Sequence, residues 1–364
     1  MAEKLLVDDP VMRKLLPAIG RCAQYLKGQA AAGRRFYVKF DGDGDGISAG
    51  ILVYHALKAC GAVHIASVQA PTAAYDVREA EKDLRNANGP EDTVFVFLDH
   101  AANPESADGI ALVRKTAAGV AFIDHHPYSP EIRRIADAFV SPMEFVEQGA
   151  SYNTGLLAFE VARRMDAATA DERLAFYSMQ TDKSRFAKKT DFKEPVAIEY
   201  AAFNHKRTLK YYDNLLADPE RLKDFHEAAV EKTEAALEKA EDVADYRKSG
   251  RGVVALVHFE EIIRPTEYPS RSKIITEFQV RHEKGHPGLV TLGLSQKHLG
   301  FRASRRAVEL GFDAAKVIGE LKKEFGKAIR TGGGHSVAAS LKAESEHLPA
   351  IAREAARLAA LQMQ

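Results

Sequence analysis

The chain has 364 residues, 46% hydrophobic and 28% charged, with 51 lysines and arginines against 51 aspartates and glutamates. This size and composition predict two or three globular domains and exclude a disordered or fibrous chain. The balanced charge also excludes an overall basic coat for nucleic acid, so any basic surface must be local.

Cys22 and Cys60 are the only cysteines and lack the spacing of a metal motif. So few cysteines are typical of a reducing compartment. The first 16 residues are amphipathic and charged, without a hydrophobic leader core, and no apolar run approaches the ~20 residues that span a bilayer. We therefore expect a soluble cytoplasmic protein without a membrane partner.

Short apolar runs alternate with helical patterns through the first half of the chain. The expected strands are residues 34–40, 63–69, 93–99 and 119–124, and the expected helices are 46–60, 76–86, 150–165 and 170–181. The strands are rich in β-branched and aromatic residues, as buried strands are. This alternation predicts an α/β fold with a mostly parallel sheet.

The pattern changes after about residue 190. Residues 190–249 are strongly charged and helical in pattern, and they end in a glycine stop. Further strand-like runs, a helix around 313–326 and a Gly-rich turn, "TGGGHSVAAS", follow. We therefore expect three parts: a first domain over 1–190, a helical connector over 191–249, and a second, smaller α/β domain over 250–364.

The stretch "FDGDGDG" places Asp41, Asp43 and Asp45 at alternate positions after an apolar run. In an extended chain these carboxylates would share one face and repel each other, so a positive partner is required. The stretch resembles the start of an EF-hand loop, but the twelfth position is Leu52 rather than Glu, and no phosphate-loop lysine follows. An Asp/Gly-rich surface turn is the alternative for this stretch alone.

Later segments place further acids and histidines at the ends of apolar runs. These residues are Asp99, His100, Asp124, His125, His126 and Asp182. Because the carboxyl ends of parallel strands form one edge, we expect the groups to gather there. Burying so many carboxylates requires cations. Oxygen ligands with a minority of imidazole favour Mn²⁺ or Mg²⁺ over a structural zinc ion.

The triplet Asp124-His125-His126 resembles the signature of the DHH phosphoesterases. The resemblance extends to the acidic motif at 41–46, to Asp99, to Asp182 and to "GGGHSVAAS" at 332–340, which is similar to the end of the companion DHHA1 domain. These five motifs stand in the family order and cover most of the chain. The resemblance implies a mostly parallel DHH domain, a smaller α/β DHHA1 domain and a cleft between them.

The resemblance also implies roles for individual residues. One metal ion would be held by Asp41, Asp43 and Asp99, and a second by Asp45, Asp99, His125 and Asp182. Mn²⁺ is expected as the metal, with Mg²⁺ as the alternative. His126 would face the substrate or nucleophile, Asp124 would orient a histidine, and His100 would do either job or be structural.

In the family a Gly-rich loop and an Arg-Ser pair grip the nucleotide, which implies substrate-binding roles for Arg302, Ser304, Gly332, Gly333, Gly334 and His335. The glycines alone are equally typical of a tight turn. Lys183 and Arg185 follow Asp182 where the family usually has small residues, and they bind phosphate or form a solvated turn. Asp41 also departs from the pattern, because many members have His there, and Ser340 replaces a glycine.

The implied activity is that of a RecJ-like or nanoRNase-like exonuclease acting on single-stranded DNA or RNA or on short oligonucleotides. Short substrates are favoured because no OB-like module is visible. A small-molecule phosphohydrolase, acting on cyclic dinucleotides, a nucleoside bisphosphate or pyrophosphate, is the alternative. A replisome scaffold is another, and replication or repair proteins could dock on residues 219–248. The sequence predicts no oligomeric state.

Overall fold

The computed structural model describes residues 5–72, 74–147, 149, 151–203 and 205–364. The chain forms two compact units, residues 1–226 and 227–364. The boundary lies inside a long helix, α10 (Pro219–Val243). The division into 1–190, 191–249 and 250–364 stays a prediction. None of the described helices is long and apolar enough to cross a bilayer.

The first unit is built on a parallel five-stranded sheet with the strand order β2-β1-β3-β4-β5. Its strands are β1 (Arg35–Phe40), β2 (Ile65–Gln69), β3 (Thr93–Leu98), β4 (Gly119–Ile123) and β5 (Ala138–Val140). The structure confirms the expected parallel α/β fold. Strand β5 was not predicted, because three residues are too few to show a period.

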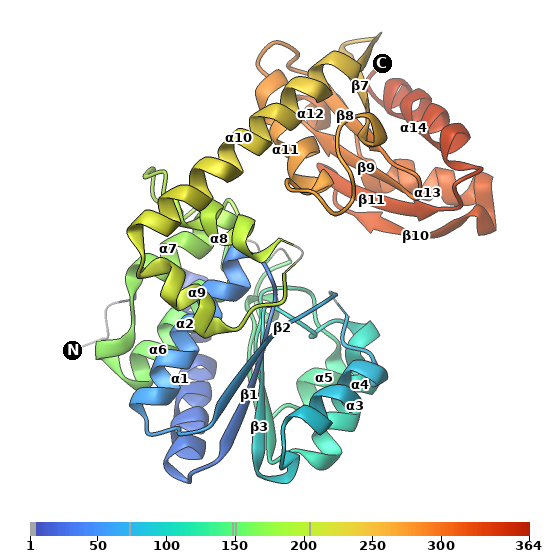
Figure 1. The fold of residues 1–364 in the computed structure, drawn as a ribbon. Helices are drawn as coiled ribbons and strands as arrows, with labels where there is room; N and C mark the ends of the chain where they lie inside the picture. Colours follow the sequence, from blue (N-terminus) through green and yellow to red (C-terminus); the bar gives the residue numbers. More distant parts are fainter. Residues whose placement is uncertain (1–4, 73, 148, 150, 204) are drawn as a thin grey trace. The chain divides into compact units, whose positions relative to one another are not determined.

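Helices cover both faces of this sheet. They are α1 (Pro10–Ala31), α2 (Gly44–Ala59), α3 (Val77–Asn86), α4 (Ala107–Thr116), α5 (Pro130–Ile135), α6 (Thr154–Met165), α7 (Glu172–Thr181), α8 (Glu194–Ala202) and α9 (Leu209–Leu216). Helices α1, α2 and α6 pack on one face, and α3, α4 and α5 lie on the other (Figure 1).

Alternation along β1 shows why the strands are apolar throughout. Phe36, Val38 and Phe40 point into the core under α1, α2 and α6. Tyr37 points into the opposite core, under α3 and α4. Because successive side chains of a strand point to opposite faces, a sheet covered on both sides needs apolar residues at nearly every position. Lys39, on the Tyr37 side, is a buried exception.

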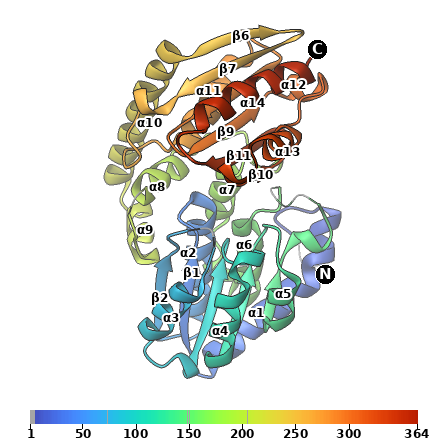
Figure 2. The same ribbon diagram turned by 90° about the vertical axis from the view of Figure 1, so that its right-hand side faces the viewer.

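The second unit is a mixed six-stranded sheet with the order β10-β11-β9-β8-β7-β6 (Figure 2). Its elements are β6 (Asp245–Ser249), β7 (Gly252–His258), α11 (Arg271–His282), β8 (Leu289–Leu294), β9 (His298–Ala303), α12 (Arg305–Glu309), α13 (Ala314–Phe325), β10 (Ile329–Gly334), β11 (Ala338–Ala343) and α14 (Leu348–Gln362). Helices α12, α13 and α14 share one core with the sheet, and α10 and α11 share the other.

Two segments differ from the expected structure. Residues 245–249 are strand β6 rather than helix, and they pair antiparallel with β7 through a turn at Gly250, which has a φ of 51°. The Gly-rich run is a turn only in part, because the turn lies at residues 335–337. Gly332, Gly333 and Gly334 end β10 and pair with β11. A Cβ at Gly332 would lie 2.8 Å from Leu341 Cβ, so the glycine permits the close crossing of the two strands.

Candidate metal centre

The acidic motif forms the turn from β1 into α2. Asp43 is the N-cap of α2, and its Oδ1 accepts the main-chain N–H groups of Asp45 and Gly46, each at 2.9 Å. The expectation that the acids alternate along an extended strand is therefore wrong. They converge because the chain turns sharply, and a Cβ at Gly46 would lie only 2.6 Å from the carbonyl oxygen of Asp41.

Asp45 is fully buried and is held by hydrogen bonds from two other helices. Its carboxylate accepts the main-chain N–H of Thr154 at 2.9 Å and that of Gly155 at 2.6 Å, both in the first turn of α6. The hydroxyl of Ser178 in α7 donates to it at 2.7 Å. The positive end of a helix stabilises a carboxylate in this position.

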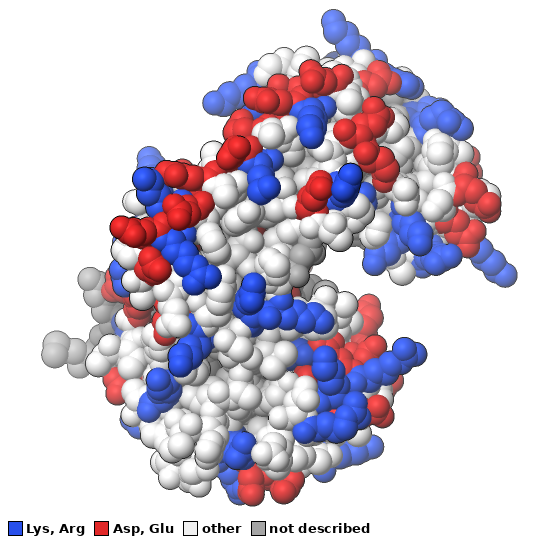
Figure 3. Space-filling view, viewed as in Figure 1, with Lys and Arg blue, Asp and Glu red and all other residues white. Residues whose placement is uncertain are grey.

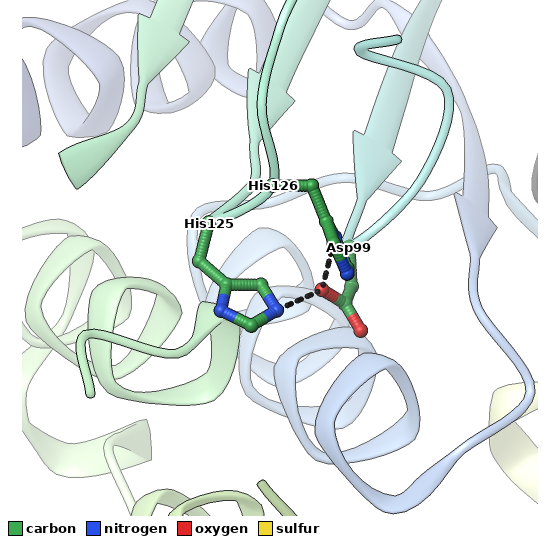
Figure 4. A group of neighbouring side chains, drawn as sticks. All are labelled: Asp99, His125 and His126. Carbon is green, nitrogen blue, oxygen red and sulfur yellow. Dashed lines mark ion pairs between the residues drawn. The ribbon is translucent and has the colours of Figure 1, made fainter. Parts of the chain in front are cut away.

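Asp99 lies between two histidines at the end of β3 (Figure 4). Its Oδ1 is 3.3 Å from His125 Nε2 and 3.4 Å from His126 Nδ1, both of which follow β4. The φ of Asp99 is 56°, a left-handed conformation that costs about 1–2 kcal/mol in a non-glycine residue. The hydroxyl of Thr154 donates to the same oxygen at 2.8 Å. The carboxylate is therefore held in one orientation.

His125 connects Asp99 to the remaining acids. Its Nε2 is 3.8 Å from Asp45 Oδ2 and 3.6 Å from Asp182 Oδ2, at the C-terminus of α7. At this edge of the sheet, three groups have candidate ligand atoms within 4.8 Å of one another: Asp41, Asp43 and Asp99; Asp45, His125 and Asp182; and Asp99, His125 and His126. The first two contain the residues that were expected for two ions. The third adds His126.

The cluster fits divalent cations better than it fits any protein partner. Asp182 Oδ2 and His125 Nδ1 are buried without a hydrogen-bond partner. Within the described part of the chain, no lysine or arginine forms an ion pair with Asp41, Asp43, Asp45, Asp99 or Asp182. A mostly carboxylate donor set suits Mn²⁺ or Mg²⁺.

Burial and mutual repulsion raise the pKa of several of these carboxyl groups. The pKa of Asp43 rises to about 7 through burial and the charges of Asp41 and Asp45. The pKa of Asp182 rises to about 10 through burial and the charge of Asp45. Burial and the charge of Asp45 also raise the pKa of Asp99. Such groups hold protons until cations replace them.

Asp124 orients His126 rather than joining the cluster. Its Oδ1 accepts from the main-chain N–H of His126 at 2.9 Å and lies 3.0 Å from His126 Nδ1. Although burial opposes it, this hydrogen bond raises the pKa of His126 to about 9 and lowers that of Asp124. The His126 side chain is 56% exposed, so its second ring nitrogen is available to a ligand.

His100 turns away from this polar edge. It is buried beside Tyr75 and Phe97, with ring centroids 6.2 Å and 6.5 Å away, and burial lowers its pKa to about 4. The imidazole is therefore neutral at pH 7, and both ring nitrogens lack a hydrogen-bond partner. A catalytic role for His100 stays a prediction, and its packing is that of a core residue.

The two basic residues after Asp182 differ in their surroundings. Lys183 is exposed. Arg185 is bound to Asp9 at 3.0 Å and to the hydroxyl of Tyr152 at 2.6 Å. This guanidinium therefore fastens the start of α1, and its expected phosphate contact stays a prediction.

The second unit contains a cavity of about 540 Å³. It is lined by Phe259, Arg271, Ser272, Ile275, Gly293, Ser295, His298, Gly300, Arg302, Gly333, Gly334, Ala338, Ala339 and Ser340. None of these is acidic. Arg302 donates to Thr276 Oγ1 at 2.9 Å, to Ser272 Oγ at 3.0 Å and to the carbonyl oxygen of Phe301 at 2.8 Å. A guanidinium held only by neutral acceptors is suited to an anionic ligand.

Arg302, Gly333 and Gly334 therefore line this cavity, whereas the other expected substrate residues do not. Ser304 is buried as the N-cap of α12, accepting from Ala307 N and donating to the carbonyl oxygen of Pro287. Gly332 packs on Leu341. His335 is exposed in the turn between β10 and β11.

The residues that sequence reasoning missed include two at each site. Thr154 and Ser178 hold the acids, and Arg271 and Ser272 line the cavity. Thr154 follows Asn153 at the start of α6, and Arg271 follows Ser270 at the start of α11. That N-cap pattern was the available signal, but it marks many helices that bind nothing.

The fold and the site define the first unit as a parallel α/β domain with carboxylates and histidines at the carboxyl edge of its sheet. Residues 35–183 match the family model of the DHH family, N-terminal domain, so the chain carries a DHH-family domain, as predicted. No curated protein matches the chain in sequence.

Solved structures share the fold at low sequence identity. The DHH domain of a protein described as a member of a ribosomal-protein family is 19% identical, with a TM-score of 0.88 over 100% of this chain and 95% of that one. Manganese-bound RecJ from Thermus thermophilus is 14% identical, with a TM-score of 0.63 over 94% and 55%. An exopolyphosphatase-related protein from Bacteroides fragilis is 13% identical, with a TM-score of 0.57 over 94% and 97%.

Proposed function

We propose that the protein is a divalent-metal-dependent phosphodiesterase that releases nucleotides from single-stranded DNA or RNA or from short oligonucleotides. The observation that carries the proposal is the convergence of five aspartates and His125 without a lysine or arginine partner in the described chain. Once these carboxylates are ionised, cations from outside the protein are the partners that suit their charge.

Two sets of side chains would hold the ions. Asp41, Asp43 and Asp99 would hold one, and Asp45, Asp99, His125 and Asp182 the other. A bound pair of divalent ions supplies a nucleophile at neutral pH and stabilises charge on the reacting phosphoryl oxygens. The protein contributes the fixed orientation of these ligands, through Thr154 on Asp99 and through α6 and Ser178 on Asp45.

His126 is placed to handle protons. Asp124 holds its Nδ1, and this hydrogen bond raises the pKa of the ring. The exposed Nε2 can therefore donate a proton to a phosphate oxygen or to the leaving oxygen.

The cavity of the second unit supports a nucleotide substrate. At about 540 Å³ it has the size of a small-ligand site, and Arg302 supplies an anion-binding group beside the apolar side chains of Phe259 and Ile275. The same size favours the second candidate, a hydrolase of cyclic dinucleotides or other small phosphoesters. A scaffold role is disfavoured because every expected metal position keeps a competent side chain.

Parallel assays of end-labelled DNA, RNA, dinucleotides and cyclic dinucleotides with Mn²⁺ and with Mg²⁺ test the proposal. We expect mononucleotides as products and complete loss of activity with a chelator. Turnover of every substrate at the wild-type rate after chelation would overturn the metal assignment. Activity on cyclic dinucleotides alone would favour the second candidate.

A further inference from the structure

A second cavity, of about 270 Å³, lies in the first unit beyond the carboxyl end of β2. It is lined by Lys39, Val68, Gln69, Pro71, Arg78, Glu79, Lys82, Asp83, Asn86 and Lys206. None of these residues belongs to the candidate metal centre. Four of the ten are basic and two are acidic, so the charged side chains carry a net charge of plus two.

The floor of this cavity is a buried ion cluster. Lys39 is 2% exposed, and its ammonium group contacts Asp83 Oδ2 at 2.7 Å and Glu79 Oε1. The hydroxyl of Tyr37 donates to the other oxygen of Asp83 at 2.8 Å. The two carboxylates outnumber Lys39, so the positive character of the cavity comes from its rim.

Helix α3 supplies one side of that rim. Arg78 and Lys82 are four residues apart and therefore lie on one face of the helix. Glu79 and Asp83 lie on the adjacent face, which points toward Lys39. Both are exposed, and neither has an ion-pair partner in the described chain. Like charges at this spacing repel each other. Lysine and arginine side chains gather on the surface over α3 (Figure 3).

Lys206 supplies the opposite side, from the segment before α9. That segment is fastened to β2: the N–H of Arg207 donates to Gln69 Oε1 at 3.3 Å, and that of Leu209 donates to Ser67 Oγ at 3.0 Å. The hydroxyl of Tyr212 donates to the same oxygen of Gln69 at 2.6 Å. These bonds place the rim segment beside the end of the strand.

Gln69 also joins this cavity to the acidic loop. A Cβ added at Gly42, between Asp41 and Asp43, would clash with the side-chain amide of Gln69. Lys39 lies in β1, two residues before Asp41. The cavity and the candidate metal centre are therefore linked through the contact of Gln69 with Gly42.

The geometry points to this cavity as a phosphodiester-binding subsite for the part of a single-stranded nucleic acid that extends beyond the cleaved bond. The inference rests on the proposed function, because the acidic loop defines where the bond is cut. Arg78, Lys82 and Lys206 contact the backbone phosphate of a further nucleotide and carry no base specificity. A dinucleotide has a single phosphodiester, which is the bond that is cut, so only longer strands place a further backbone phosphate in the subsite.

The test compares two ligands in the absence of divalent ions, so that hydrolysis does not enter. Calorimetry measures the affinity of the full chain for a dinucleotide and for an oligothymidylate of about eight nucleotides. Lys82→Ala and Lys206→Ala are each expected to lower the affinity for the longer ligand about three- to tenfold. The affinity for the dinucleotide should not change. Each variant should also lower the salt dependence, the slope of log K against log salt, by about 0.7.

Arg85→Ala is the matched control. Arg85 lies on the same helix, is exposed and does not line the cavity. Equal losses of affinity in Arg85→Ala and Lys82→Ala would show general electrostatic attraction and would overturn the subsite. Unchanged affinity for the longer ligand in both lysine variants would overturn it as well. If the wild-type protein binds the oligothymidylate with the expected salt slope but hydrolyses nothing with Mn²⁺, the proposed function fails while the subsite stands.

Discussion

The main-chain N–H of Thr154 donates to the carboxylate of Asp45 at 2.9 Å, across 109 positions of sequence. The Thr154 hydroxyl donates in turn to Asp99. One residue at the start of α6 therefore orients two of the acids that would hold metal. Oriented carboxylates bind divalent ions more tightly than mobile ones do.

Thr154→Val should test this positioning. Valine keeps the shape and the main-chain N–H but loses the hydroxyl that holds Asp99. We expect the apparent affinity for Mn²⁺ in the hydrolysis assay to fall about 10–100-fold. Thr169→Val, which removes a hydroxyl bonded only to the carbonyl oxygen of Asp166, should leave it unchanged. Equal metal affinity in the two variants would contradict the role of Thr154.

Asp99 is the acid shared by two of the candidate ligand groups. Asp99→Asn removes its charge at constant shape, so we expect metal-dependent hydrolysis to fall by at least about 100-fold. His125→Ala should act similarly. Circular dichroism should show both variants folded, and Asp242→Asn, at an exposed position of α10, should retain full activity. Turnover near the wild-type rate in a folded Asp99→Asn protein would remove the basis for the metal assignment.

The stability of the metal-free protein should fall as pH rises. The folded-state pKa values of Asp182, about 10, and His126, about 9, lie above the ordinary values of 3.8 and 6.5. The stabilisation that each group provides is fully present below the group's ordinary pKa. It is lost as pH rises through the pKa of the group in the folded state. Asp182 alone changes the free energy of unfolding by up to about 1.4 kcal/mol per pH unit.

Thermal unfolding with and without Mn²⁺ measures this effect. We expect the increase in Tm caused by Mn²⁺ to be larger at about pH 8 than at about pH 6, because ions replace protons on the carboxylates. Asp182→Asn should make the Mn²⁺-induced increase in Tm more similar at the two pH values. An increase that is independent of pH would show that these groups do not titrate as the geometry indicates.

Arg302 is expected to act in binding rather than in the chemical step. Arg302→Lys keeps a positive charge but loses the planar fork that Thr276 and Ser272 hold. We expect KM to rise about tenfold with kcat little changed. Arg305→Lys, at a 96% exposed side chain, provides the control. A fall in kcat at constant KM would instead place Arg302 in the chemistry.

The order of elements in the first unit follows from local signals. Strands β1 to β4 were predicted because a sheet covered on both faces needs apolar residues throughout. Asp99 and His125 stand out as polar residues just after two of these runs. The alternation of strand and helix also predicted the parallel sheet. These signals depend on neighbours in sequence, so they are visible without the fold.

Local patterns indicated the wrong conformation at two glycine-rich sites. Asp41, Asp43 and Asp45 lie in a turn and the first turn of α2, because Asp43 caps the helix. The glycines at 332–334 end a strand, because β11 supplies partners for their main chain. In both cases a hydrogen-bond partner decided between two conformations that glycine-rich sequences allow equally.

By itself, the sequence determined which chemistry is available: acids and histidines at strand ends, and glycines where the main chain must turn or pass closely. The tertiary structure alone decided which of those groups meet. It brought Thr154 and Ser178 to the acids, took Arg185 and Ser304 into structural contacts, and placed Lys206 opposite α3. The physical reason is that a contact between residues far apart in sequence depends on how the helices and strands pack, and no local pattern encodes that packing.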